Sequence, residues 1–196
     1  MSQNYYQTHA QTFFDGTVNV DMSPLHKAFT RHLPARAKVL DAGCGSGRDA
    51  LAFKQLGYRV EAFDASPELV ALAKDHCGLP VKQMTFAGVN EQAQFDGIWC
   101  CASLLHVPFA ELPGVMHKLA AALKPGGIWY FSFKYGEGER EQEGRTFTDI
   151  NEARLAALLA SLASVSVSVS VIEQWITQDV RPGRDEKWLN CLVMKQ

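Results

Sequence analysis

Hydrophobic and polar positions along the chain switch between a strand-like and a helix-like spacing from about residue 36 onward. Apolar runs predict strands at residues 38–42, 58–63, 95–102, 127–133, 164–171 and 188–194, with a weaker one at 80–84. Helical spacing predicts helices at residues 49–56, from 67 onward, at 109–123 and at 148–162. Strands that alternate with helices in this way predict an α/β fold, a mostly parallel sheet with helices on both faces.

Three segments in the second half of the chain have distinct patterns. Residues 136–145 are charged and glycine-rich without an apolar face, which predicts a mobile loop at the carboxyl end of the preceding strand. Serine and valine alternate strictly over residues 164–171, as expected for an edge strand with one apolar face. Residues 188–194 are apolar almost throughout, as expected for a strand flanked on both sides.

Glycines occupy every second position of the turn between the first strand and its helix. In the pattern Asp41-x-Gly43-x-Gly45-x-Gly47 the missing side chains allow a tight bend and close approach of a ligand, which predicts a nucleotide-like cofactor. A dinucleotide site would have G-x-G-x-x-G, but Arg48 stands where its third glycine belongs. Asp64 closes the second strand, where a carboxylate can accept both hydroxyls of a ribose. The alternative is that these residues only make a turn and cap the next helix.

These residues together resemble the class I S-adenosylmethionine-dependent methyltransferases over essentially the whole chain. The resemblance is carried by residues 39–49 with the glycine turn, by Asp64-Ala65-Ser66, by residues 95–99 and by residues 123–127. A narrower resemblance to bacterial tellurite-resistance-type methyltransferases is carried by residues 45–49 and 103–107. The class resemblance implies a Rossmann-like seven-stranded sheet whose last strand is antiparallel and inserted between the fifth and sixth.

The resemblance also implies S-adenosylmethionine as cofactor and assigns residues to it. The glycine turn with Cys44 would line the methionine portion, Asp41 would orient its amino group, and Asp64 would hold the ribose. Residues near adenine and the sulfonium would be Ala65, Ser66, Cys101, Ala102 and Ser103. An acidic residue that often follows the third strand in the family is missing, so that only Thr85, or a backbone carbonyl near Phe86, is left to recognise adenine.

Residues expected around the methyl acceptor are drawn from three parts of the chain. His106 follows the fourth strand near the expected methyl position and is the candidate general base, although it can equally pack the turn before Pro108. Lys134, Tyr135, Arg145 and Arg181 are candidate acceptor-binding residues, against the alternative of a solvated charged loop. Tyr5 and Tyr6 are candidates for a lid whose rings attract the sulfonium, whereas Phe13 and Phe14 are expected to pack.

Composition and charge narrow the choice of partners. The 196 residues predict one domain, divided into an N-terminal helical lid (1–35), a cofactor-binding half (36–135) and an acceptor-side region (136–196). A formal net charge of −2 gives no general attraction to nucleic acid or anionic lipid. The absence of a membrane-length apolar run and of a secretion signal predicts a cytoplasmic protein. Five cysteines without C-x-x-C spacing are expected to be reduced and to hold no metal.

The function expected from the sequence is therefore methyl transfer from S-adenosylmethionine to a small molecule, by a monomer or homodimer. Transfer to RNA or protein is the alternative within the same chemistry, and a protein that binds the cofactor without chemistry is an alternative outside it. The glycine spacing disfavours a dinucleotide-dependent oxidoreductase.

Overall fold

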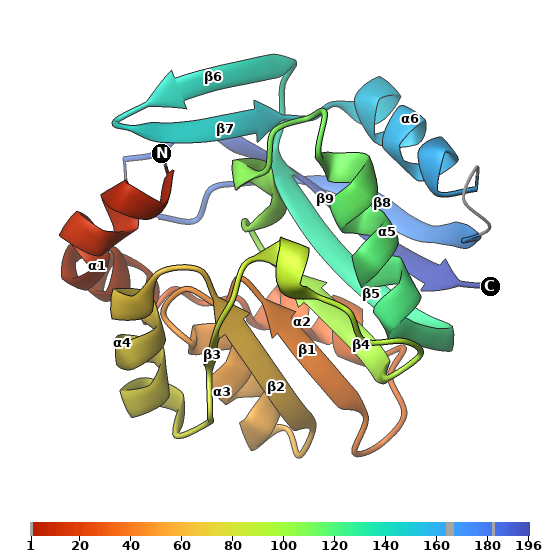
Figure 1. Cartoon of the computed structure of the whole chain (residues 1–196), viewed down its shortest axis with the longest axis horizontal. Coiled ribbons are helices and arrows are strands. Elements are labelled where there is room, and N and C mark those ends of the chain that lie inside the picture. Colours follow the sequence, from red (N-terminus) through yellow and green to blue (C-terminus); the bar gives the residue numbers. More distant parts are fainter. Residues whose placement is uncertain (1, 164–166, 182) are drawn as a thin grey trace.

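A seven-stranded sheet crosses the middle of the molecule in this computed structural model, which describes residues 2–163, 167–181 and 183–196 (Figure 1). Its strand order is β3-β2-β1-β4-β5-β9-β8. The strands are β1 (Lys38–Ala42), β2 (Arg59–Asp64), β3 (Lys82–Gln83), β4 (Phe95–Cys100), β5 (Leu123–Lys134), β8 (Val169–Gln178) and β9 (Lys187–Lys195). Strands β1 to β5 pair in parallel, and β9 lies antiparallel between β5 and β8. The predicted α/β class and the insertion of the last strand are confirmed.

Helices cover both faces of this sheet. They are α1 (Ser2–Thr17), α2 (Ser23–Thr30), α3 (Arg48–Gln55), α4 (Pro67–Cys77), α5 (Leu112–Ala122) and α6 (Glu152–Ala163), with short 3-10 turns η1 (Phe86–Gly88) and η2 (Leu104–His106). Buried apolar residues of α5 and α6 pack on one face, and those of α2 and α3 pack on the other. Side chains alternate accordingly along β4, where Trp99 faces α2 and α3 while Ile98 and Cys100 face α5 and α6.

The segment predicted to be a mobile loop is instead a β-hairpin. Its strands β6 (Gly138–Gln142) and β7 (Arg145–Asp149) pair antiparallel over their whole length. Glu143 and Gly144 form the two-residue turn, and both have the positive φ (53° and 72°) that the tightest hairpin turns require. The apolar face that stabilises the hairpin comes from Phe147, which lies beyond the charged stretch, so the prediction of a loop was wrong.

Two further boundaries differ from the prediction. Because Thr148 is part of β7, the helix expected from residue 148 begins at Glu152 instead. The edge strand expected at 164–171 begins at Val169, opposite Lys195, and continues to Gln178 through a bulge between Val171 and Glu173. Residues 164–166 of that prediction lie outside the described residues.

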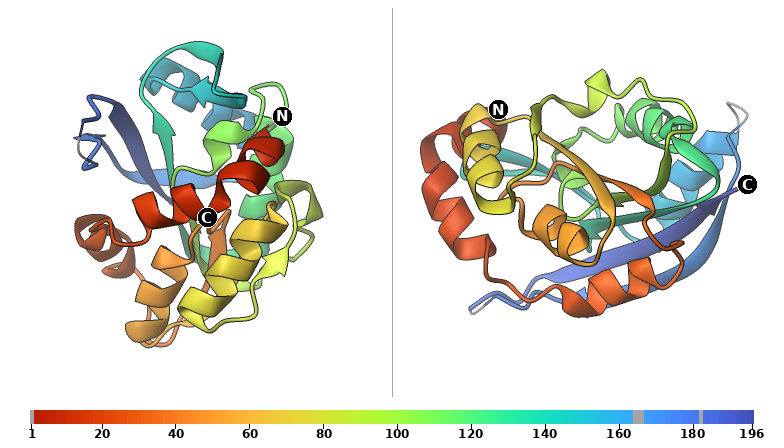
Figure 2. Two further views of the ribbon diagram at one scale, coloured as in Figure 1. Left: turned by 90° about the vertical axis from the view of Figure 1, so that its left-hand side faces the viewer. Right: turned by 90° about the horizontal axis from the view of Figure 1, so that it is seen from below.

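Helix α1 lies against α4 and β7, so it crosses the edge of the sheet where the parallel strands end (Figure 2). Its backbone leaves helical geometry at His9 (φ −118°, ψ 19°), where the two parts of the helix meet. The expected helical lid therefore occupies the side of the sheet that carries the glycine turn. In the part of the chain that the structure describes, no helix is long and apolar enough to span a membrane. The cytoplasmic location stays a prediction.

Candidate functional site

The glycine turn after β1 depends on glycine for both its conformation and its packing. Gly43, Gly45 and Gly47 have φ values of 76°, 53° and 75°, a region that other residues rarely adopt. A Cβ on Gly43 would lie 2.6 Å from the Cβ of Ser103, and one on Gly47 would lie 3.1 Å from the backbone of Ala73. The turn is therefore pressed between the end of β4 and helix α4.

Two carboxylates flank this turn. Asp64 accepts hydrogen bonds from the backbone N–H of Gly45 (2.9 Å) and of Ser66 (3.0 Å), which ties the end of β2 to the glycine turn. Asp41 is buried, and its Oδ2 has no hydrogen-bond partner among the described residues. Burial raises the pKa of both carboxyls, and the nearby Asp49 charge raises that of Asp41 further. A cationic group at Asp41 would compensate for that burial.

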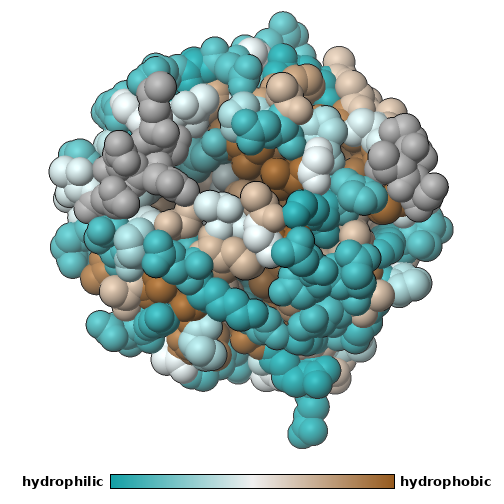
Figure 3. All heavy atoms as spheres, in the orientation of Figure 1, coloured by the Kyte–Doolittle hydropathy of each residue, from teal (hydrophilic) through white to brown (hydrophobic). Residues whose placement is uncertain are grey.

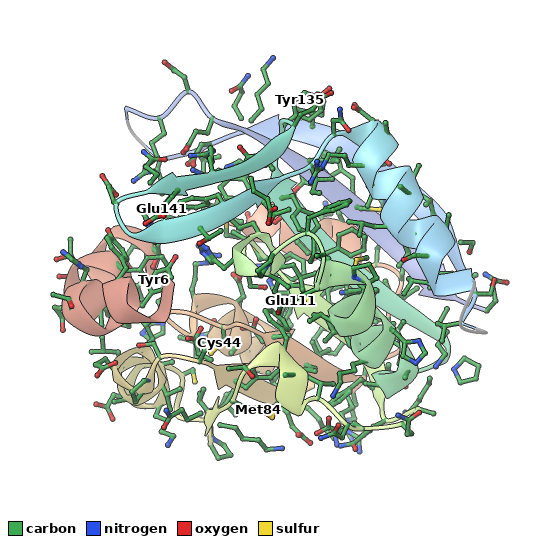
Figure 4. All side chains as sticks on the ribbon, turned by 45° about the horizontal axis from the view of Figure 1, so that its top comes forward. Tyr6, Cys44, Met84, Glu111, Tyr135 and Glu141 are labelled. Carbon is green, nitrogen blue, oxygen red and sulfur yellow. The ribbon has the colours of Figure 1, made fainter. Side chains whose placement is uncertain are left out.

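A first cavity of about 510 Å³ opens beside Asp64. It runs from the glycine turn past the ends of β2, β3 and β4 to the start of α5. The residues predicted near ribose and adenine line it: Asp64, Ala65, Ser66, Thr85, Phe86, Ala102 and Ser103. Met84 and Glu111, both labelled in Figure 4, line this cavity from the segments after β3 and before α5.

A second cavity of about 290 Å³ lies on the other side of the glycine turn. Its wall combines aromatic rings with cationic side chains from α3, β5, β7 and the connection between β8 and β9. Of the predicted residues, Tyr6, Cys44, Cys101, Lys134, Arg145 and Arg181 line it. On the face of the molecule seen in Figure 1, Figure 3 shows small apolar patches between hydrophilic side chains.

The two cavities meet at the edge of the sheet. The residues that line both are Tyr6, Phe13, Gly43, Gly45, Ala102 and His106. Tyr6 and Phe13 belong to α1, so the N-terminal helix forms one wall of the junction, as the position of Tyr6 near Cys44 in Figure 4 illustrates. A reactive group that reaches this junction from one cavity faces the contents of the other.

His106 is fixed at this junction by both ring nitrogens. Its Nδ1 lies 2.9 Å from the carbonyl oxygen of Thr146 and its Nε2 lies 2.8 Å from the hydroxyl of Tyr6. A carbonyl only accepts, so Nδ1 carries the proton and Nε2 accepts from Tyr6. Burial lowers the pKa of His106 to about 4, helped by the charges of Arg145 and Lys134, and burial raises the pKa of Tyr6 to about 12. The pair is therefore neutral near pH 7, and the lone pair of the imidazole is engaged.

The cations of the second cavity gather around Phe147. The Nζ of Lys134 lies 4.5 Å from the centre of that ring and the guanidinium of Arg145 lies 5.2 Å from it. Lys134 is paired with Glu186, and burial lowers its pKa. Arg145 is paired at 2.6 Å with Glu143, whose side chain is 61% exposed. The Nε of Arg145 is buried and has no hydrogen-bond partner among the described residues.

A buried polar network fixes the wall below this cavity. Arg48 donates two hydrogen bonds of 2.8 Å to Asp49, which also accepts from the indole of Trp99 (2.9 Å) and contacts Nε2 of His26 (2.9 Å). Burial alone would raise the pKa of Asp49, but the paired Arg48 and His26 hold it well below its usual value. Arg48 is thereby held against the second cavity, which it lines.

Some predicted site residues lie outside both cavities. Tyr135 is exposed, and its hydroxyl donates to Glu152 (3.0 Å), so the expectation that it lines the acceptor site is corrected. Tyr5 also lines neither cavity. Its ring stacks on that of His9, and the guanidinium of Arg145 lies 4.2 Å from the centre of the Tyr5 ring. Gly47 faces α4 rather than a cavity, and the buried Asp41 also lines neither cavity.

Other lining residues were missed or assigned differently. Phe13, expected to pack, lines both cavities, and the sequence pattern does not predict Arg48, Glu111 and Phe147, which each line one cavity. The turn residues Glu143-Gly144 could have indicated the hairpin that carries Phe147. Among the described residues, no group of three or more histidine, cysteine or acidic side chains is placed to hold a metal ion.

Comparisons with known proteins connect this geometry to a family. A model described as a methyltransferase domain matches residues 39–127. The ubiquinone biosynthesis O-methyltransferase of Xanthomonas axonopodis pv. citri is 34% identical over 106 residues, which are 50% of this chain and 44% of that protein. The chain thus spans less than half the length of this curated relative.

Solved structures match over nearly the whole chain. The 1,6-didemethyltoxoflavin-N1-methyltransferase of Burkholderia thailandensis, solved with 1,6-didemethyltoxoflavin and S-adenosylhomocysteine, has a TM-score of 0.77 and 25% identity, covering 98% of this chain and 84% of that one. The magnesium protoporphyrin IX methyltransferase of Synechocystis PCC 6803 has a TM-score of 0.73 at 16% identity, covering 99% and 95%, and shares the fold. The narrower tellurite-resistance resemblance stays a prediction. The domain match over residues 39–127, the relatives and the strand order together make this chain similar to the class I S-adenosylmethionine-dependent methyltransferases.

Proposed function

We propose that the protein transfers the methyl group of S-adenosylmethionine to a small molecule. The observation that carries this proposal is the meeting of two cavities at the glycine turn, one lined by the predicted cofactor residues and the other by aromatic and cationic side chains. Methyl transfer needs this arrangement, because the acceptor atom must approach the methyl carbon from the side opposite the departing sulfur, with water excluded.

The first cavity and the glycine turn suit the cofactor. Asp64 keeps lone pairs for the ribose hydroxyls beside its two backbone bonds, and the unpartnered Oδ2 of Asp41 suits the ammonium group of the methionine portion. The glycines, which have no side chains, leave room for the part of the cofactor that joins its ribose to its ammonium group. When bound there, the cofactor supplies a methyl group already activated by a sulfonium.

Glu111 is our proposed substitute for the missing acidic residue after β3. It lines the first cavity together with Thr85, and its side chain is exposed. The other acidic side chain that lines this cavity, Asp64, is already engaged at the glycine turn. A carboxylate can accept from the exocyclic amino group of adenine, which would distinguish adenine from a base with a carbonyl at that position.

The second cavity suits a small acceptor rather than a segment of a polymer. Its volume of about 290 Å³ matches the lower end of small-molecule sites. Helix α1, the β6–β7 hairpin and the β8–β9 connection all contribute to its wall. We assign Tyr6, Lys134, Arg145 and Arg181 to the acceptor and keep His106 as a residue at the point of transfer.

Calorimetric titration tests the proposal. We expect the protein to bind S-adenosylmethionine and S-adenosylhomocysteine but not NAD, and Asp64→Ala to weaken binding by about 3 kcal/mol, roughly a hundredfold, for two lost hydrogen bonds to a carboxylate. Transfer of labelled methyl into small-molecule extracts is the second step. No binding of either sulfur compound by folded protein contradicts the proposal. Binding without transfer to any small molecule or RNA points to a non-catalytic binding protein.

A further inference from the structure

The side chains that line the second cavity include more cations than carboxylates. The charged side chains that line it are Arg48, Lys134, Arg145, Arg181 and Arg184 against Asp21, Asp49 and Asp179, with Tyr6 and His106 neutral between them. Asp49 and Asp179 are each paired with a neighbouring arginine, Arg48 and Arg181. Lys134 and Arg184 share Glu186, and Arg145 pairs with Glu143, but neither of these two glutamates lines the cavity. Asp21 is exposed and lies before α2. The side of the cavity formed by β5 and β7 therefore faces its contents with cations.

Arg145 is a largely buried cation with one donor that no atom of the described residues accepts from. Its side chain is only 12% exposed, yet its charge partner Glu143 projects into solvent at the hairpin turn, where screening weakens the pair. Its Nε lies buried without a partner among the described residues. An arginine held between the rings of Tyr5 and Phe147 with an unused donor fits a planar anion better than a neutral ligand.

His106 is poorly suited to take a proton from the acceptor. Its Nε2 already accepts from Tyr6, and a protonated ring would stand beside the two cations Arg145 and Lys134. These same charges would favour the ionised form of an acidic acceptor. The electrostatics thus select for an acceptor that enters, or becomes, an anion without help from a basic side chain.

We propose, on the basis of the proposed function, that the acceptor is an aromatic molecule with an acidic hydroxyl, bound as its oxyanion by Arg145 and Lys134 beside the ring of Phe147. Its proton goes to solvent. The ionised oxygen then forms the bond to the methyl carbon while the carbon–sulfur bond breaks, and the electron pair of that bond stays on sulfur. The products are a neutral methyl ether and a neutral thioether. Tyr6 and His106 act as positioning residues at the junction.

4-Nitrophenol tests the charge selection without knowledge of the natural acceptor, because only its ionised form absorbs strongly in the visible. We expect saturable binding in the presence of S-adenosylhomocysteine and a pKa of the bound phenol lowered by at least about one unit. 4-Nitroanisole has the same ring without the ionisable oxygen, and we expect it to bind more weakly.

Substitutions of arginine show which side chain causes the pKa shift of the bound phenol. Arg145→Met keeps an apolar stem but removes the charge, and we expect it to abolish most of the shift, whereas Arg145→Lys retains most of it. Arg31→Met is the matched control, since Arg31 lines neither cavity and its exposed side chain pairs with Glu173. Thermal melts and S-adenosylhomocysteine titration verify that each variant is folded.

The outcomes separate this inference from the proposed function. The inference would be overturned if 4-nitrophenol showed no saturable binding, if the pKa of the bound phenol were unshifted or raised, or if the shift were unchanged in Arg145→Met. In each of these cases, binding of S-adenosylhomocysteine would leave the methyltransferase proposal intact. Failure of S-adenosylhomocysteine to bind would instead remove the methyltransferase proposal on which the inference rests. A lowered pKa that depends on Arg145 and not on Arg31 supports it.

Discussion

The packing of Gly43 leads to a prediction that separates backbone strain from loss of space at the site. Gly43→Ala places a Cβ 2.6 Å from that of Ser103, where ordinary contacts are at least 3.4 Å, so one of the two segments must move by close to 1 Å. Ser103 is not free to move, because its hydroxyl donates to the carbonyl of Ala42 (2.8 Å) at the end of β1. Overpacking of this kind costs about 1–3 kcal/mol.

The substitution also incurs a conformational cost, since Gly43 has φ +76° and an alanine there costs about 1–2 kcal/mol. Gly126→Ala is the matched control: Gly126 has φ +73°, and a Cβ there meets nothing within 4 Å. We therefore expect a loss of about 1–2 kcal/mol in unfolding free energy for Gly126→Ala and about 2–5 kcal/mol for Gly43→Ala.

Urea unfolding at fixed pH measures both losses, and titration with S-adenosylhomocysteine measures the site. We expect Gly126→Ala to bind as the wild type does and Gly43→Ala to bind at least tenfold more weakly, because the displaced segments line both cavities. Equal destabilisation by the two substitutions would refute the packing argument. Unchanged ligand affinity in Gly43→Ala would refute the placement of the cofactor at the glycine turn.

Three further predictions concern single side chains. Glu111→Gln should reduce the preference for S-adenosylhomocysteine over S-inosylhomocysteine about tenfold in calorimetry, and an unchanged ratio argues against an adenine contact. His106 has a folded pKa of about 4 against an unfolded value near 6.5, so its protonation opposes folding and stability is lost as pH falls through that window. Relative to His106→Gln, the wild type should lose up to roughly 3 kcal/mol of unfolding free energy between pH 7 and pH 4, and parallel pH profiles would contradict this. Trp99→Phe removes a hydrogen-bond donor from the buried Asp49, whereas Trp129→Phe removes one that donates only to a sulfur. Trp99→Phe should therefore lower the unfolding free energy by about 1–3 kcal/mol more than Trp129→Phe. Equal thermal melts of the two variants would refute a role for the bond to Asp49.

Much of the geometry around the glycine turn could be predicted because its signals are local in the sequence. The glycine turn and the cap at Ser66, whose hydroxyl accepts from the N–H of Leu69, each depend on residues a few positions apart. Asp64 ends β2, and the parallel pairing of β1 with β2 brings it beside the turn, where it bonds Gly45. Short-range spacing and the geometry of parallel strands are enough to specify such a site.

The second cavity could not be predicted to the same depth, because it is built from contacts between distant segments. Tyr6 and His106 are 100 residues apart in the chain and meet only because α1 crosses the sheet edge. The charged residues 136–145 do not predict the hairpin, because the ring that stabilises it, Phe147, lies outside that stretch.

The neighbours Lys134 and Tyr135 illustrate the division between what sequence and structure decide. The sequence by itself determined that both follow a buried strand at the edge where ligands bind. Successive residues of a strand point to opposite sides, so only one of the two can face the cavity, and the local pattern does not say which. In the tertiary structure Lys134 faces the cavity, where it packs on Phe147 and pairs with Glu186. Tyr135 points outward and donates to Glu152. The order of elements and the glycine turn were thus determined by local spacing, whereas the charge and shape of the second cavity depend on which faces the packed elements present to one another.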